Sequence, residues 1–236
     1  MLNCSGKKQQ LNPLLPGVAK VAKNLTRVLN DPERSGFEVT CIFDKGLMTV
    51  CKVIVKTCSE SEPDDILLTY YSGTSVCDVH GSMQLPVGYS DHGYPMATCI
   101  ESEFILPQMR QSRYQRFVLI VDGCHSGALF RNNRGITDGL IALTSCSAEE
   151  VSGDTPLTQS LLRALNSCRA DKNHNGCMTV DDGYDLIGQD KTPMAFVAYP
   201  QKWVWNLSEP ILQIRSSLRV FLSYSRADSQ IADRLV

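Results

Sequence analysis

The chain has 236 residues, of which 43% are hydrophobic and 20% charged, and its formal net charge at pH 7 is −2. This composition is typical of a globular domain with a sizeable core, and it excludes the strong positive charge expected of a protein that binds nucleic acid or an anionic membrane surface. No apolar run approaches the ~20 residues of a membrane helix, and the start MLNCSGKKQQ lacks the apolar core of a signal peptide, so we expect neither a membrane span nor secretion.

The ten cysteines contain no CxxC pair, which gives zinc ligation no support from spacing. Several of them lie inside apolar segments, where a free cysteine packs as a small hydrophobic side chain. This usage predicts a reducing, cytoplasmic compartment.

The first half of the chain predicts helices alternating with strands. Helical spacing of apolar residues covers 14–30 and ends at Asp31-Pro32, and the residues of 37–43 alternate as in a strand. Residues 46–58 favour a helix, and the apolar run 66–71 predicts a buried parallel strand. Residues 75–100 are rich in Gly, Ser, Pro and Asp, so a long loop is expected there.

The second half continues the alternation. A short helix is expected over 103–109, buried strands over 117–122 and 141–145, and a helix over 157–165. Strands that alternate with helices predict an α/β fold with a mainly parallel sheet. Reactive groups in such sheets lie beyond the carboxyl ends of the strands, which here carry Ser72-Gly73-Thr74-Ser75 and Asp122-Gly123-Cys124-His125.

Cys124 follows a buried strand, and Gly123 and Gly127 let the backbone fold closely around it. Such a turn can direct backbone N–H groups at an oxyanion, and a thiolate is a good nucleophile once its pKa is lowered. The position alone fits a buried structural cysteine equally well.

The string Asp122-Gly123-Cys124-His125-Ser126-Gly127 resembles the D-x-C-H-S-G nucleophile motif of the caspase-like superfamily, in its metacaspase and orthocaspase branch. The segments LNPLLPGVAKVAKNLTRVL, DDILLTYYSG and LTSCSAEEVSGD also resemble that family in order, over about residues 11–214. The resemblance implies a three-layer caspase-like domain over 1–214 and a cysteine endopeptidase. In that family an apolar strand precedes the first helix, and here MLNCSGKKQQ takes its place, so the first strand is expected to be missing.

The second departure from the family concerns the catalytic base. The family's active-site strand ends S-G-H-G, and its His lies ~50 residues before the Cys, which in this chain is Thr74. A threonine cannot accept the thiol proton near neutral pH, so an impaired protease is expected. His80 and His92 are the candidate surrogate bases, and a non-catalytic pseudocaspase scaffold or sensor is the alternative function.

The resemblance also implies a substrate pocket and cleavage after Arg or Lys, with Asp122 and Glu149 or Glu150 as the acidic residues. The other interpretation of Asp122 is that its carboxylate caps local N–H groups. Protein or peptide substrates are the expected partners.

No cofactor is expected, apart from weak Ca²⁺ binding by the segment DKNHNGCMTVDD over 171–182. Its pattern is similar to an EF-hand loop, with candidate ligands that share side-chain oxygens: Asp171, Asn173, Asn175 and Asp182. A turn stabilised by Asx side chains before a helix is the favoured interpretation.

The residues from Leu218 onward resemble the start of a TIR domain, whose signature is F-[LI]-S-Y-S-x-x-D. Residues 218–225 predict a strand, and the residues after Asp228 predict a helix. We therefore expect residues 215–236 to be a linker and the first part of a TIR domain. That resemblance implies signalling or defence, self-association through the TIR part, and an NAD-consuming effector as a third functional possibility.

Overall fold

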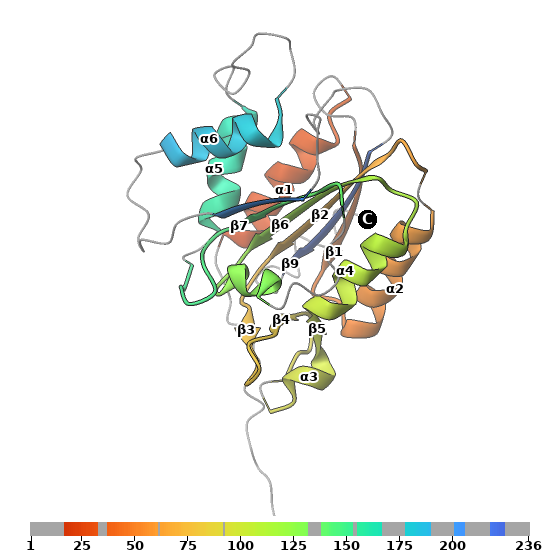
Figure 1. The fold of residues 1–236 in the computed structure, drawn as a ribbon, viewed down its shortest axis with the longest axis vertical. Helices are drawn as coiled ribbons and strands as arrows, with labels where there is room; N and C mark the ends of the chain where they lie inside the picture. The colour runs from red at the N-terminus through yellow and green to blue at the C-terminus, as the bar shows by residue number, and fades with distance from the viewer. Residues whose placement is uncertain are drawn as a thin grey trace, which may run out of the picture.

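The computed structural model places the elements of one α/β fold (Figure 1). The residues that it describes are 17–32, 37–60, 62–91, 93–131, 138–152, 155–166, 178–189, 201–205 and 218–224.

The helices are α1 (Val18–Leu29), α2 (Leu47–Ser59), α3 (Pro95–Thr98), α4 (Ser102–Gln111), the 3₁₀ helix η1 (Ser126–Phe130), α5 (Pro156–Leu165) and α6 (Val180–Gln189). The strands are β1 (Phe37–Phe43), β2 (Ile66–Ser72), β3 (Val76–Cys77), β4 (Met83–Pro86), β5 (Cys99–Glu101), β6 (Arg116–Asp122), β7 (Leu140–Thr144), β8 (Gln201–Trp205) and β9 (Leu218–Tyr224).

Six strands form the central sheet in the order β1-β9-β2-β6-β7-β8. All neighbours are parallel except β8, which runs antiparallel to β7. Every residue of β2 and β7 is buried, because helices cover both faces of a parallel sheet and such strands become continuous apolar runs. The predicted α/β fold with a mainly parallel sheet is confirmed.

The helices make the outer two of three layers (Figure 1). On one face α1, α5 and α6 pack on Leu68, Val118, Ile120 and Leu143, and on the other face α2 and α4 pack on Leu67 and on alternate residues of β6 and β7. Each strand therefore supplies both cores with alternate side chains.

The segment 75–100 differs from its prediction as a loop. It contains the antiparallel sheet β3-β4-β5 and the short helix α3. These strands have only two to four residues each, and the glycine, serine and proline residues around them favoured the prediction of a loop. Met83 and Leu85 of β4 are buried in the same core as α2 and α4, and this packing holds the small sheet in place.

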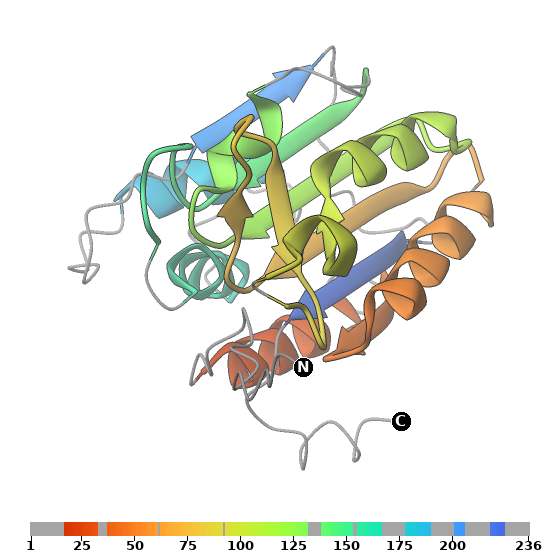
Figure 2. The same ribbon diagram turned by 90° about the horizontal axis from the view of Figure 1, so that it is seen from below.

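The position of β9 was not predicted. The sequence indicated a strand over 218–225, and the structure places Leu218–Tyr224 inside the central sheet, between β1 and β2 (Figure 2). Residues 1–16, where the missing first strand was expected, and residues 225–236 lie outside the described residues. The division into a domain over 1–214 and a TIR start over 215–236 stays a prediction.

Two further elements were not predicted or were only partly predicted. The antiparallel strand β8 escaped the sequence analysis, and α6 follows the segment in which only a turn before a helix was expected. None of the described helices has the length and apolar character that crossing a membrane requires.

Candidate functional site

Thr74 and Cys124 follow two strands that lie side by side in the sheet. The strands β2 and β6 are parallel and paired throughout, with Ser72 opposite Asp122, and the Gly73 N–H donates to the Asp122 carbonyl oxygen at 3.1 Å. The segments that follow β2 and β6 therefore leave the sheet side by side, at the carboxyl ends of the two strands. Positions 74 and 124 thus lie just beyond the carboxyl ends of two neighbouring parallel strands.

The two segments remain in contact beyond the strands. A Cβ atom at Gly123 would lie 2.4 Å from the Gly73 carbonyl oxygen and 3.1 Å from the Ser75 hydroxyl, so only glycine fits at position 123. The Ser75 hydroxyl donates to the carbonyl oxygen of Cys124, and Ser75 is 2% exposed. The structure thus brings Gly73, Ser75, Gly123 and Cys124 together.

Thr74 is held from the side of α2 and α4. The Tyr71 hydroxyl lies 2.8 Å from the Thr74 carbonyl oxygen and 2.9 Å from the carbonyl oxygen of Pro86. Tyr71 is itself buried, so this hydroxyl joins the end of β2 to β4 inside the core. Position 74 is fixed by its backbone and its side chain is partly exposed.

The Cys124 thiol is partly buried and has one weak hydrogen-bond partner. Its Sγ atom lies 3.6 Å from the carbonyl oxygen of Ser152. Burial raises the pKa of this thiol above its ordinary value and outweighs the opposing hydrogen bond to the Ser152 carbonyl oxygen, while Cys146 and Asp122 add smaller upward contributions. A thiol in this environment is protonated at neutral pH and is a weak nucleophile until a base removes its proton.

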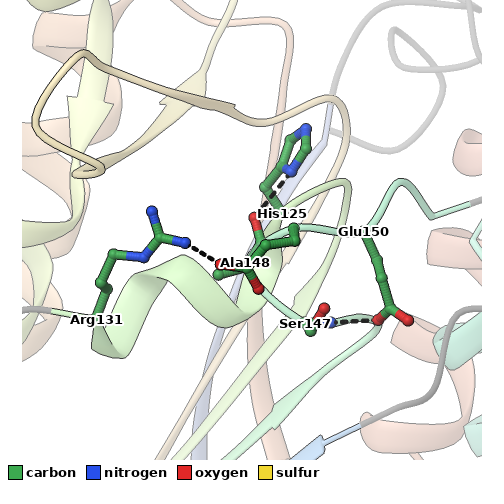
Figure 3. A network of polar contacts seen from close by, with 6 residues as sticks. His125, Arg131, Ser147, Ala148 and Glu150 are labelled. Atoms are coloured by element: carbon green, nitrogen blue, oxygen red, sulfur yellow. Dashed lines mark hydrogen bonds and ion pairs between the residues drawn. The ribbon is translucent and has the colours of Figure 1, made fainter.

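The described histidines do not supply that base. In His125, Nδ1 lies 3.0 Å from the Ala148 carbonyl oxygen, and the backbone N–H donates to the carbonyl oxygen of Glu150 at 2.9 Å (Figure 3). His80 is exposed on the turn between β3 and β4, where its backbone N–H donates to Asp78 at 2.8 Å. Among the hydrogen bonds of the described residues, none joins either histidine to Cys124, and His92 lies outside them.

The predicted pocket residues separate into two places. Glu149 forms an ion pair with Arg131 of the turn after η1, and Glu150 accepts a hydrogen bond from the Ser147 N–H at 2.8 Å (Figure 3). The side chain of Glu149 is 74% exposed. Both carboxylates therefore stabilise the loop that wraps around η1, and no described contact joins them to Asp122.

Asp122 occupies a buried polar cluster on the face of α1 and α5. Its Oδ2 atom accepts hydrogen bonds from the N–H and the hydroxyl of Thr158, at 2.7 and 2.5 Å. The Tyr70 hydroxyl lies 2.7 Å from the same Thr158 hydroxyl, so Tyr70, Thr158 and Asp122 form one chain of hydrogen bonds. The carboxylate thus caps the first turn of α5, as the capping interpretation predicted.

Burial dominates the electrostatics of Asp122. Removal from water raises the pKa of its carboxyl group from 3.8 to about 6, although the hydrogen bonds from α5 oppose the shift. Its second oxygen, Oδ1, and the Ser72 hydroxyl on the neighbouring strand have no hydrogen-bond partner among the described residues. These two buried polar atoms belong to residues that pair directly across β2 and β6.

The candidate calcium loop lies mostly outside the described residues, including Asp171, Asn173 and Asn175. The described member, Asp182, accepts hydrogen bonds from the Thr179 N–H at 3.0 Å and the Thr179 hydroxyl at 2.7 Å, and its own N–H donates back at 3.0 Å. This is a capping box at the start of α6. The part of the chain that the structure describes holds no cluster of metal-ligating side chains.

Sequence reasoning missed several residues that shape the site: Tyr70, Tyr71, Ser75, Ser152 and Thr158. Of these, only Ser75 lies in a segment that the sequence analysis named as a place for reactive groups, the one that follows the strand 66–71. A signal for Thr158 was present in the Thr155-Pro156 helix start, because the open N–H groups of a helix start attract a carboxylate. The sequence does not say that this carboxylate is Asp122.

Comparison with known proteins supports the fold. No protein-family model matches the chain, and no match was found among curated protein sequences. The structure is similar to that of protein GSU0716 from Geobacter sulfurreducens, with a TM-score of 0.54 and 16% identity, over 80% of this chain and 84% of that one. It also matches caspase-1 from Spodoptera frugiperda, with a TM-score of 0.49 and 14% identity, over 91% of this chain and 83% of that one. At 16% identity, the likeness to the Geobacter protein extends to the fold alone.

Proposed function

We propose that the chain is a caspase-like cysteine endopeptidase domain whose nucleophile is Cys124 and whose activity is impaired because Thr74 replaces the catalytic histidine. The observation that carries the proposal is the parallel pairing of β2 with β6. This pairing places position 74 and Cys124 just beyond the carboxyl ends of two neighbouring strands. The nucleophile motif resembles that of the metacaspase and orthocaspase branch, and the geometry fits the roles that the resemblance assigns.

The reaction would begin with attack of the Cys124 sulfur on a peptide carbonyl carbon. The backbone around Gly123 and Cys124 can supply N–H groups for the oxyanion. The missing part is the acceptor of the thiol proton: burial raises the pKa of the thiol, and Thr74 has no basic group. General-base catalysis is typically worth about 10²–10⁴-fold, so the chain should cleave peptides slowly at most.

The buried carboxylate supports a preference for Arg or Lys at the cleavage site. Asp122 Oδ1 and the Ser72 hydroxyl have no partner among the described residues, and a guanidinium group would satisfy both. Asp122 is 3% exposed, so a substrate side chain reaches it only if the first turn of α5 moves. Glu149 and Glu150 remain secondary candidates, because they already bind Arg131 and Ser147.

A non-catalytic scaffold or sensor, coupled to a TIR domain in a signalling or defence protein, is the second candidate. The observation that favours it is the raised pKa of the Cys124 thiol, which no described histidine side chain reaches with a hydrogen bond.

Peptide cleavage by the whole chain distinguishes the two. Fluorogenic peptides ending in Arg, Lys or Asp would be offered to the wild type, to Thr74→His, to Thr74→His with Ser75→Gly, and to each variant with Cys124→Ala. The peptidase proposal expects weak or no wild-type cleavage, a gain on the order of 10²–10⁴-fold in both Thr74→His variants, and loss of that gain with Cys124→Ala. If the Thr74→His variants fold but cleave nothing, the scaffold is favoured.

A further inference from the structure

The strand β9 comes last among the described elements of the chain but lies in the interior of the sheet. It pairs with β1 from Phe37↔Leu218 to Phe43↔Tyr224, and with β2 from Ile66↔Leu218 to Ser72↔Tyr224. Among the described residues β1 has no other strand partner, so β9 alone joins β1 to the rest of the sheet.

The chain can reach this position from β8 on the far side of the sheet. Trp205, the last residue of β8, pairs with Leu140 at the same end of the sheet at which Leu218 pairs with Ile66. Four steps between neighbouring strands separate β8 from β9, which is about 19 Å at ~4.8 Å a step. Residues 206–217 can span up to about 40 Å, so the chain is long enough for β9 to enter or leave without moving β8.

Without β9, two strands would present unpaired backbone edges. From Phe37 to Cys41, β1 alternates between buried or half-buried and exposed residues, whereas β2 is buried along its whole length. Each edge would expose the unpaired N–H and C=O groups of alternate residues along a seven-residue strand, and such edges bind further strands readily. The groove between β1 and β2 therefore fits one extended segment of seven residues in parallel orientation.

The segment that fills this groove is also the segment predicted from the sequence to begin a separate TIR-like domain. One strand cannot pair inside two sheets at once. We propose that the groove between β1 and β2 is a strand-acceptor site, and that Leu218–Tyr224 is its detachable occupant. Withdrawal of the segment opens one edge of β2, the strand that delivers Ser72 to Ser75 to the site, so folding of the segment elsewhere in a longer protein alters the site.

The test uses the full chain and measures binding and stability, so it is independent of any peptidase activity. Val220→Pro removes a backbone N–H from the middle of β9, and Val220→Ile is the matched control that keeps it. The probe is a labelled peptide of residues 216–226, with a second peptide that carries the same Val220→Pro change. Peptide binding is measured by fluorescence anisotropy, and the melting temperature is measured with and without each peptide.

We expect Val220→Pro to lower the melting temperature by about 5–10 °C, and Val220→Ile to leave it nearly unchanged. The unmodified peptide should bind the proline variant at least tenfold more tightly than the wild type, whose groove is occupied, and should restore much of the lost melting temperature. The proline peptide should do neither. An unchanged melting temperature in Val220→Pro, or equal peptide binding to variant and wild type, would overturn the proposal.

Hydrogen exchange of the wild type keeps the test decisive if Val220→Pro does not fold. A detachable β9 predicts that amides of β1 and β9 exchange together and at least tenfold faster than those of β6 and β7. Equal protection across all these strands would show that β9 leaves only on global unfolding, and the proposal would then be wrong.

Discussion

The Ser75 hydroxyl donates a hydrogen bond to the carbonyl oxygen of Cys124, and this bond ties the segment after β2 to the turn that carries the nucleophile. The bond is partly buried, since Ser75 is 2% exposed and Cys124 is of intermediate exposure. A glycine at position 75, as in the family that the sequence resembles, cannot make it. The Ser75 side chain therefore links the two segments in a way that a glycine would not.

We expect Ser75→Ala to lower the free energy of unfolding by about 1 kcal/mol, because the Cys124 carbonyl loses its side-chain donor. The melting temperature should fall by about 2–4 °C. Ser59→Ala is the matched control, since the Ser59 hydroxyl bonds to the Lys56 carbonyl oxygen on the exposed side of α2 and should contribute little. Equal melting temperatures for the two variants would show that the bond between Ser75 and Cys124 adds no stability.

The same bond changes how a base should be restored. Thr74→His together with Ser75→Gly introduces the imidazole and also removes the tie to Cys124. The single variant Thr74→His keeps the tie, so we expect it to melt at a higher temperature than the double variant and to cleave Arg- or Lys-ended peptides at least as fast. A faster and more stable double variant would show that the Ser75 side chain obstructs the imidazole.

Asp122 should make the stability of the chain fall as the pH rises. Its pKa is about 6 in the folded protein, against 3.8 as its ordinary value, so the folded state favours the protonated carboxyl group. The stabilisation from this group is complete below pH about 3.8 and is lost as the pH rises through about 6. As the pH rises from below about 3.8 to neutral, the wild type should lose roughly 3 kcal/mol of unfolding free energy relative to Asp122→Asn.

Urea unfolding of both proteins between pH 4 and pH 7 measures this difference. Asparagine keeps an oxygen for the two hydrogen bonds from Thr158 but does not ionise, so the comparison isolates the charge. Parallel curves for the two proteins would mean that Asp122 keeps its ordinary pKa in the fold.

The loop 171–182 should bind Ca²⁺ no more tightly than millimolar. Its carboxylates are few, and that of Asp182 already accepts two hydrogen bonds from Thr179 at the start of α6. Titration calorimetry of the whole chain with Ca²⁺ should show no binding at micromolar concentration, and Asp182→Asn should lower the unfolding free energy by up to about 1 kcal/mol. Micromolar binding that Asp182→Asn abolishes would identify a true calcium loop.

Much of the fold could be predicted because its strands are continuous apolar runs. The segments 66–71 and 117–122 carry their own signal, since a strand that is buried on both faces has no polar side. The strands of 75–100 could not be predicted in this way, because they are short and depend on packing against the main core. The interior place of β9 depends on pairing with β1 and β2, which lie far away in sequence, and no local pattern specifies such partners.

The site divides in the same way. The sequence indicated that positions 74 and 124 each follow the carboxyl end of a buried strand, and the pairing of those two strands required the structure. The contacts of Ser75 with Cys124 and of Asp122 with Thr158 depend on the exact approach of two loops and one helix, so they required coordinates. The family resemblance assigned Glu149 or Glu150 to the pocket, and in the structure their carboxylates bind Arg131 and Ser147.

The rate at which iodoacetamide alkylates Cys124 at pH 7, followed by peptide mapping in wild type and Thr74→His, tests the account most directly. The wild-type thiol has a raised pKa and should react slowly, with a rate that keeps rising beyond pH 9. An imidazole at position 74 should accept the thiol proton and raise the rate at pH 7 by at least tenfold, while Thr74→Val should leave it unchanged. Two results would contradict the claim that position 74 is where the catalytic base is missing. One is an equal rate in all three proteins, and the other is a fast wild-type reaction that His80→Ala or His92→Ala slows.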